Sequence, residues 1–202
     1  PPDLQHESGY GEAGCSRGVA TPYQSFTRLA GQGEITIGGE TIAVKGQAWM
    51  DHEFSTASLE PGIAGWDWFS LQLADNSEIM VYLFRTAAGG IHAASSGTYI
   101  KADNSVRKLA KEDISLEVMD TWHSKISKGR YPVRWRMQIA TLDADLKISA
   151  KFADQEMRTL DTTGVTYWEG SVAISGIKNK QPIEGEGYVE LTGYAEPFDA
   201  PI

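Results

Sequence analysis

The chain has little of several features that mark common classes of protein. Its 202 residues include a single cysteine, Cys15, so an internal disulfide is excluded. Only 18 Lys and Arg residues stand against 27 Asp and Glu, and no stretch concentrates the basic ones, so no nucleic-acid partner is expected. The net charge of −9 says little about other partners. The longest apolar runs, such as residues 79–84, are far too short to span a bilayer, so stable membrane insertion is not expected.

Helical periodicity is also scarce, and an alternation of apolar and polar residues takes its place. Clear runs lie at residues 113–118, 133–139 and 145–152, where every second side chain is apolar. Such alternation is typical of antiparallel strands with one buried face and one wet face. Short turn signals separate the alternating runs: Gly38-Gly39, Asp75-Asn76, Gly89-Gly90 and Asp143-Ala144.

The pattern predicts an all-β fold of about ten antiparallel strands in a meander that closes into a β-barrel. A barrel of this size encloses side chains or one small ligand. Residues 105–112 are the place where we expect a turn or two of helix. We expect a linker or entry segment at 1–18, the barrel domain at 19–195 and a tail at 196–202. The chain begins at Pro1 without a methionine or a signal-peptide pattern, so we expect a trimmed start or a fragment of a longer protein.

The densest chemistry lies in residues 49–55 and 65–69, which hold three tryptophans, several acids and a histidine within two expected strands. A tryptophan ring favours burial with a partner for its N–H. Acids flanked by tryptophans therefore suggest an apolar pocket with a few polar groups aimed into it. The candidate ligand-binding residues are Trp49, Asp51, Phe54, Trp66, Trp68, Phe84 and Trp135.

The candidate catalytic residues are His52, Asp67 and Tyr82. His52 is either a proton donor inside the cavity or a histidine that a neighbouring carbonyl fixes within a packed motif. On a strand it points away from Asp51 and Glu53, so the three side chains cannot converge on one metal ion, and no metal site is expected.

Asp67 also allows two interpretations. It is either a carboxyl whose pKa burial raises, able to protonate an alkene, or one member of a buried hydrogen-bond network. Trp66 and Trp68 fall on the opposite strand face from Asp67 unless a bulge intervenes.

Other patterns carry less weight. Residues 14–18 formally fit G-x-S-x-G, but that motif works on a strand-to-helix turn of an α/β sheet, and here it precedes an all-β region. Arg134 and Arg136 could clamp an anion, although the solvated side of an amphipathic strand is favoured because Trp135 then points inward. Glu184, Glu186 and Glu190 predict a similar wet face.

Several motifs resemble the AttH-like and hydroxyneurosporene synthase (carotenoid 1,2-hydratase) family. The resemblance rests on Trp49-Met50-Asp51-His52-Glu53-Phe54-Ser55, Gly65-Trp66-Asp67-Trp68-Phe69 with residues 71–73, and residues 80–85, 95–98, 23–29 and 185–194. These matches cover nearly the whole chain, and the tryptophan-rich motif is the most specific of them.

The resemblance implies a lipocalin- or calycin-like β-barrel that is the second of two such domains, with a preceding N-terminal lipocalin-like domain as its partner. It also implies a bacterial protein with a periplasmic or secreted location, because some members are described as secreted hydrolases. Other members hydrate the end double bond of acyclic carotenoids, and fungal relatives resemble Diels–Alder cyclases. The shared theme is an apolar substrate.

The carotenoid hydratases have a histidine followed two positions on by tryptophan, and a tyrosine followed two positions on by aspartate. His52 matches the histidine, but Phe54 stands where the tryptophan belongs. Tyr82 aligns with the tyrosine, and Phe84 occupies the place of the acid. Loss of that carboxyl weighs against carotenoid hydration by this chain.

We therefore expect a domain that binds a hydrophobic small molecule, such as a lipid, isoprenoid or polyketide-like compound, and uses no cofactor. An enzyme of the hydratase or cyclase type acting on an apolar polyene is the alternative, and a secreted hydrolase is a weaker one. The ligand is expected inside the barrel, where apolar burial would hold it and His52, Asp67 and Tyr82 would orient it.

Overall fold

The computed structural model describes residues 3–4, 10–12, 20–53 and 59–197, with side chains described from residue 22 onward. These parts of the chain form fourteen β-strands and two short 3-10 helices, neither of which is long enough to cross a membrane. The elements are β1 (Asp3–Leu4), β2 (Tyr10–Glu12), β3 (Ala20–Ile37), β4 (Glu40–Glu53), β5 (Ile63–Leu73), β6 (Glu78–Thr86), β7 (Ser96–Ile100), β8 (Val106–Ala110), η1 (Lys111–Asp113), β9 (Ile114–His123), β10 (Arg130–Ile139), η2 (Ala140–Leu142), β11 (Ala144–Ala150), β12 (Glu156–Arg158), β13 (Thr166–Lys178) and β14 (Gln181–Thr192).

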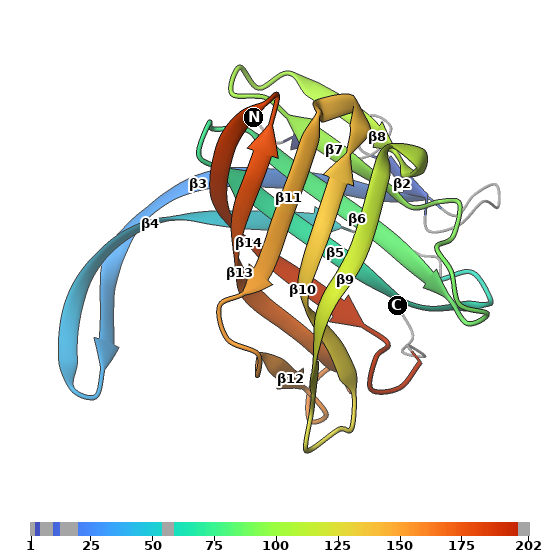
Figure 1. Ribbon diagram of the computed structural model, residues 1–202. Coiled ribbons are helices and arrows are strands. Elements are labelled where there is room, and N and C mark those ends of the chain that lie inside the picture. The colour runs from blue at the N-terminus through green and yellow to red at the C-terminus, as the bar shows by residue number, and fades with distance from the viewer. Residues whose placement is uncertain (1–2, 5–9, 13–19, 54–58, 198–202) are drawn as a thin grey trace.

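Ten strands form one antiparallel sheet in the order β8-β7-β6-β5-β14-β13-β11-β10-β9, with β12 beside β13. Strands β8 and β9 are the two edges, yet only η1 separates them along the chain. A flat sheet of nine adjacent strands would place its edges about 38 Å apart, far beyond the reach of so short a link. The sheet must therefore curl, and Figure 1 shows the resulting half-barrel. The expected all-β, antiparallel barrel of about ten strands is confirmed in this form.

The turn chemistry is confirmed where the chain reverses. Gly38 and Gly39 link β3 to β4 with φ of 60° and 88°, a left-handed conformation that glycine adopts at little cost. Asn76 and Asp143 also have positive φ, in the turns that precede β6 and β11.

The expected turn of helix at residues 105–112 is wrong. Residues 106–110 form strand β8, and only the short η1 follows. Strand β8 pairs with β7 along its whole length, and Leu109 is fully buried in the core. Pairing with a neighbouring strand outweighs the weak local preference of this segment.

The hydrophobic core fills the concave side of the curled sheet. Trp135 is fully buried in this core, and its ring forms edge-to-face pairs with Phe69 and Trp168 at centroid distances of 5.7 and 6.3 Å. Leu71, Leu146 and neighbouring aliphatic side chains complete the packing. The ligand was expected on this side, but core side chains occupy it, as they do in barrels that are packed rather than hollow. The cleft described below lies on the opposite face of the sheet.

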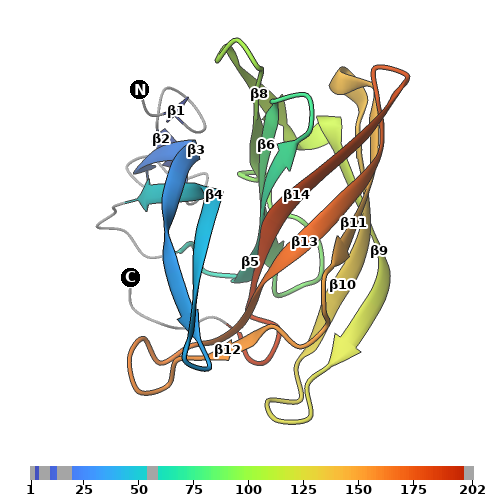
Figure 2. The same cartoon turned by 90° about the vertical axis from the view of Figure 1, so that its left-hand side faces the viewer.

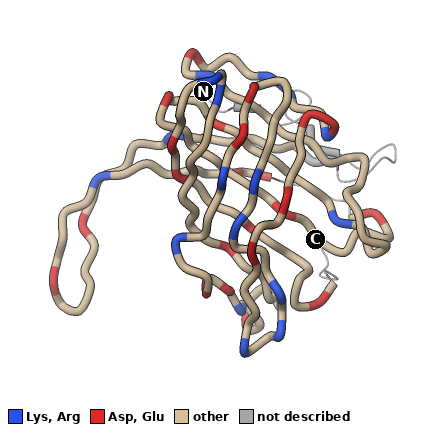
Figure 3. The backbone as a smooth tube through the Cα atoms, viewed as in Figure 1, with Lys and Arg blue, Asp and Glu red and all other residues tan. Residues whose placement is uncertain are grey.

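A second sheet consists mainly of the long β3–β4 hairpin, with β1 and β2 paired to β3. Strands β1 and β2 fall within the segment expected to be a linker. The base of the hairpin lies against the outer face of the half-barrel, while its distal part projects away from the body (Figures 1 and 2). One face of the projecting part is apolar and includes the exposed side chains of Leu29, Ile35, Ile37 and Ile42; most of the projecting part is uncharged (Figure 3).

Candidate functional site

Strand register assembles a row of polar and aromatic side chains on the outer face of the half-barrel. Glu169 of β13 lies opposite Glu190 of β14, Glu190 opposite Trp68 of β5, and Trp68 opposite Tyr82 of β6. Because directly opposed residues share a face, the four side chains stand on the same surface. None of them is adjacent to another in sequence.

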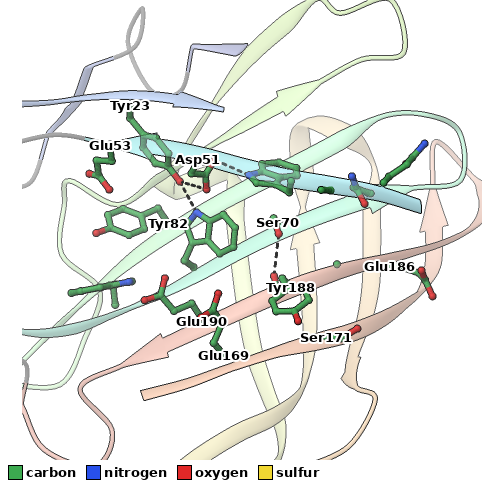
Figure 4. Close-up of a pocket in the computed structure, with 17 residues that line it drawn as sticks. Tyr23, Asp51, Glu53, Ser70, Tyr82, Glu169, Ser171, Glu186, Tyr188 and Glu190 are labelled. Atoms are coloured by element: carbon green, nitrogen blue, oxygen red, sulfur yellow. Dashed lines mark hydrogen bonds between the residues drawn. The ribbon is translucent and has the colours of Figure 1, made fainter. Parts of the chain in front are cut away.

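The base of the β3–β4 hairpin covers this row and leaves a cleft of about 800 Å³. Figure 4 shows side chains entering the cleft from β3 and β4 on one side and from β5, β6, β13 and β14 on the other. The lining residues are Tyr23, Gln47, Ala48, Trp49, Asp51, Glu53, Trp66, Trp68, Ser70, Gln72, Tyr82, Glu169, Ser171, Glu186, Gly187, Tyr188 and Glu190.

Asp51 organises the hairpin side of the cleft. Its carboxylate accepts hydrogen bonds from Tyr23 Oη at 2.9 Å, from Trp49 Nε1 at 2.7 Å and from the Ser25 hydroxyl. Trp68 Nε1 donates to Tyr23 Oη at 2.9 Å, which ties this network to the sheet. Burial raises the pKa of Asp51, and the three donors oppose that shift.

The sheet side of the cleft carries carboxyl groups held close to one another. Burial raises the pKa of Glu190 to about 7, helped by the negative charges of Glu169 and Glu53 and opposed by hydrogen bonds from Trp66 and Thr192. Burial also raises the pKa of Glu169. Figure 4 shows the Glu169 and Glu190 side chains beside each other. Near neutral pH, Glu190 therefore exists in both protonation states and can either give or take a proton.

Aromatic rings form the remaining walls. Trp49 meets Trp68 edge to face at 6.1 Å, and Trp66 lies against Tyr82 at 6.4 Å. These rings offer apolar surface to a ligand, whereas the carboxyls offer hydrogen bonds and protons. Among the described residues, no three His, Cys, Asp or Glu side chains are grouped closely enough to hold a metal ion.

The structure brings five of the sequence-derived candidates together in this cleft: Trp49, Asp51, Trp66, Trp68 and Tyr82. Burial and the charges of nearby glutamates raise the pKa of Tyr82 far above its usual value, so its hydroxyl keeps its proton.

Two candidates lie on the core side of the sheet instead. Trp135 is buried in the core, and Asp67 forms an ion pair with Arg85 (Nε to Oδ1, 2.8 Å). Tyr194 Oη donates to the other Asp67 oxygen at 3.0 Å. Burial raises the pKa of Asp67, and the Arg85 guanidinium opposes that shift. Neither Asp67 nor Trp135 lines the cleft, because odd-numbered residues of β5 and β10 point inward.

Three further candidates have other positions. His52 is exposed on the hairpin face that points away from the cleft, in line with its alternation against Asp51. Phe84 is buried beside Tyr82, with their rings 4.5 Å apart, but does not line the cleft. Phe54, Cys15 and the G-x-S-x-G motif lie outside the described residues.

Sequence reasoning missed Glu169 and Tyr23 as site residues and assigned Glu190 to a solvated face; Tyr188, a candidate cavity hydrogen-bonder on sequence grounds, does line the cleft. The alternation of β14 correctly placed Glu190 opposite the core. The missing information was the hairpin, which covers part of that face and changes it from solvated surface into cleft.

The arrangement defines a protein of lipocalin-like architecture with a cleft outside the packed barrel. The family model described as AttH-like matches residues 1–194, so the chain belongs to the AttH-like family.

Solved structures with the same fold include an AttH protein from Nitrosomonas europaea and kievitone hydratase from Nectria haematococca. The first has a TM-score of 0.86 and 34% identity, and the second has a TM-score of 0.77 and 22% identity. Each comparison covers 96% of this chain and 58% of the other. A curated relative, Dehydratase asqC from Emericella nidulans, is 20% identical over 165 residues, which is 79% of this chain and 46% of the relative. The chain thus spans about half the length of the relatives it matches.

Proposed function

We propose that this chain takes part in adding water to, or removing water from, an apolar small molecule held in the outer cleft. The observation that carries the proposal is the half-buried Glu190 carboxyl, whose pKa of about 7 suits a general acid or base at neutral pH. The names of two relatives, a hydratase and a dehydratase, support the same class of reaction.

The chemistry balances with the groups present. In the hydration direction, protonated Glu190 gives its proton to one alkene carbon, and a water molecule adds through its oxygen to the other. That water then returns a proton to the Glu190 carboxylate, so the net change is addition of one water. The rings of Trp66, Trp68 and Tyr82 would shield the cationic transition state. Dehydration is the reverse sequence.

A binding domain without catalysis is the second candidate. It is favoured by Phe84, which stands where the resembling hydratases have an acid. We also propose, as partners and setting, a further lipocalin-like domain that completes the site and a periplasmic or secreted location.

The test combines binding with isotope incorporation. A panel of alkene-bearing and hydroxylated apolar compounds, kievitone included, is incubated with the protein in water enriched in oxygen-18. We expect at least one compound to gain labelled water or to lose water. Glu190→Gln should slow that conversion by about 10²–10⁴-fold, the usual effect of removing a general acid. Glu184→Gln, on the same face of β14 but outside the cleft, is the matched control.

Two results would count against the proposal. Compounds that bind in the cleft without gaining or losing water would leave only the binding function. A protein that binds none of the panel would remove both.

A further inference from the structure

The charge in the cleft has one sign. Five of its lining residues are acidic, and none of the described lining residues is Lys, Arg or His. Two basic groups contact lining residues from outside: Lys151 Nζ lies 2.7 Å from Glu186 Oε1, and Arg28 donates to the Gln47 side chain at 3.1 Å. An anionic group in the cleft would therefore meet several carboxylates without a compensating charge.

The placement of Glu169 opposite Glu190 is costly on its own. Like charges directly across an antiparallel pair destabilise the sheet. Hydrogen bonds offset part of that cost: Trp66 and Thr192 bond to Glu190, and Tyr167 bonds to Glu169. A positive charge between the two carboxylates would turn the repulsion into attraction.

The aromatic walls of the cleft are a second, independent reason to expect a cationic ligand. The paired rings Trp49–Trp68 and Trp66–Tyr82 lie in the same cleft as the carboxyls. Electron-rich ring faces attract cations, most strongly where water is excluded, and cages of this kind recognise quaternary ammonium groups. A neutral apolar ligand packs on the rings but gains no charge attraction from ionised carboxylates.

We propose that the cleft selects ligands in which an apolar or aromatic frame carries a cationic nitrogen, either a protonated amine or a quaternary ammonium. This rests on the proposed function, for which it names the substrate class. The frame packs against the indoles, and the nitrogen lies toward Glu169 and Glu190, the carboxyl pair that Figure 4 shows on the sheet side.

The selection has a pH dependence of definite sign. The groups around Glu190 are Glu169 and Tyr167 from β13, Trp66 and Trp68 from β5, Tyr82 from β6, Glu53 from β4 and Thr192 from β14. Since none of these groups supplies positive charge, loss of the Glu190 proton leaves a carboxylate that has hydrogen bonds from Trp66 and Thr192 but no cationic partner among them. A quaternary ammonium, which does not titrate, should bind more tightly at pH 8 than at pH 5.5.

Three small benzyl compounds that differ in charge test the inference. Benzyltrimethylammonium is compared with neopentylbenzene, which replaces the charged nitrogen by carbon, and with phenylacetate, which carries the opposite charge. Binding is followed by NMR through the indole N–H signals of Trp49, Trp66 and Trp68. We expect the ammonium to bind roughly tenfold more tightly than its neutral isostere, and phenylacetate to leave the cleft signals unchanged.

The double variant Glu169→Gln/Glu190→Gln should lose most of the preference for the ammonium over its neutral isostere and keep only the part due to the rings and the remaining acids, whereas Glu184→Gln should keep the full preference. The comparison of the three probes on the unaltered protein does not depend on how the variants fold. Equal or tighter binding of the neutral isostere, or any cleft binding of phenylacetate, overturns the inference. If neutral compounds bind and are hydrated, only this inference fails; if no probe of any charge reaches the cleft, the proposed function fails with it.

Discussion

At the scale of single residues, the half-buried Glu190 carboxyl can transfer a proton near neutral pH, and its ionisation also lowers the free energy of unfolding. Its folded-state pKa of about 7 lies above its usual value of 4.5. The folded protein therefore holds this proton more tightly than the unfolded chain does. Ionisation of Glu190 consequently lowers the free energy of unfolding as the pH rises from about 4.5 to about 7.

We predict that Glu190→Gln stabilises the protein at pH 8 by roughly 2–3 kcal/mol and has little effect near pH 4.5, where the native carboxyl is already protonated. Denaturant unfolding at both pH values measures this difference. Glu184→Gln is the control, because its exposed carboxyl should give the same small change at each pH. A Glu190→Gln variant less stable than the native protein at pH 8 would show that the carboxylate is favourably paired.

At the scale of the structural element, the β3–β4 hairpin depends on a few contacts at its base. Arg28 pairs with Glu78 of β6 and donates to the Leu73 carbonyl at 3.0 Å and to Gln47 at 3.1 Å. The Glu78 side chain is only 4% exposed. Removal of one partner from a buried ion pair costs far more than the loss of an exposed pair.

We predict that Arg28→Ala lowers the free energy of unfolding by about 2–4 kcal/mol and increases hydrogen exchange in β3 and β4 before it does so in β13. Arg134→Ala is the control: its pair with Asp120 spans 3.8 Å between side chains more than half exposed, so its loss should cost under about 0.5 kcal/mol. Equal effects of the two changes would refute a special role for Arg28.

The hairpin also marks where sequence reasoning stopped. The sequence predicted the Gly38-Gly39 turn and the alternation of β4, including the opposite directions of the Asp51 and His52 side chains. The sequence did not predict that the hairpin base packs on the outer face of β5. That packing depends on contacts such as the one from Trp68 to Tyr23, which are 45 positions apart in the chain. The lining of the site follows from those contacts.

At the scale of the whole molecule, period-two alternation was enough to predict the architecture. Alternation along β10 and β11 predicted that Trp135, Met137 and Leu146 point into the core, and all three are buried there. Topology was harder, since the β14–β5 pairing joins residues more than a hundred positions apart and leaves no local signal. The cavity was therefore expected inside the barrel, where large aromatic and aliphatic side chains instead close the space.

A substitution at Trp135 distinguishes a ligand site inside the barrel from a barrel interior that is packed core. We predict that Trp135→Phe lowers the free energy of unfolding by about 1–3 kcal/mol through the lost volume, while cleft ligands bind as before. Trp68→Phe should reverse that pattern, weakening ligand binding because its ring and its bond to Tyr23 belong to the cleft. Thermal unfolding and ligand titration of both variants measure the contrast. A loss of ligand affinity in Trp135→Phe would move the binding site back into the barrel.

Because the hairpin supplies one wall of the cleft and the half-barrel the other, the two walls belong to regions of unequal packing. We expect the distal part of the hairpin to open at a lower free energy than the half-barrel, because most β4 side chains are exposed while the half-barrel holds the core. The rate at which a ligand enters the cleft would then depend on how fast the hairpin opens. A covalent cross-link across the base of the hairpin would slow ligand exchange without altering the fraction of protein that has ligand bound at equilibrium.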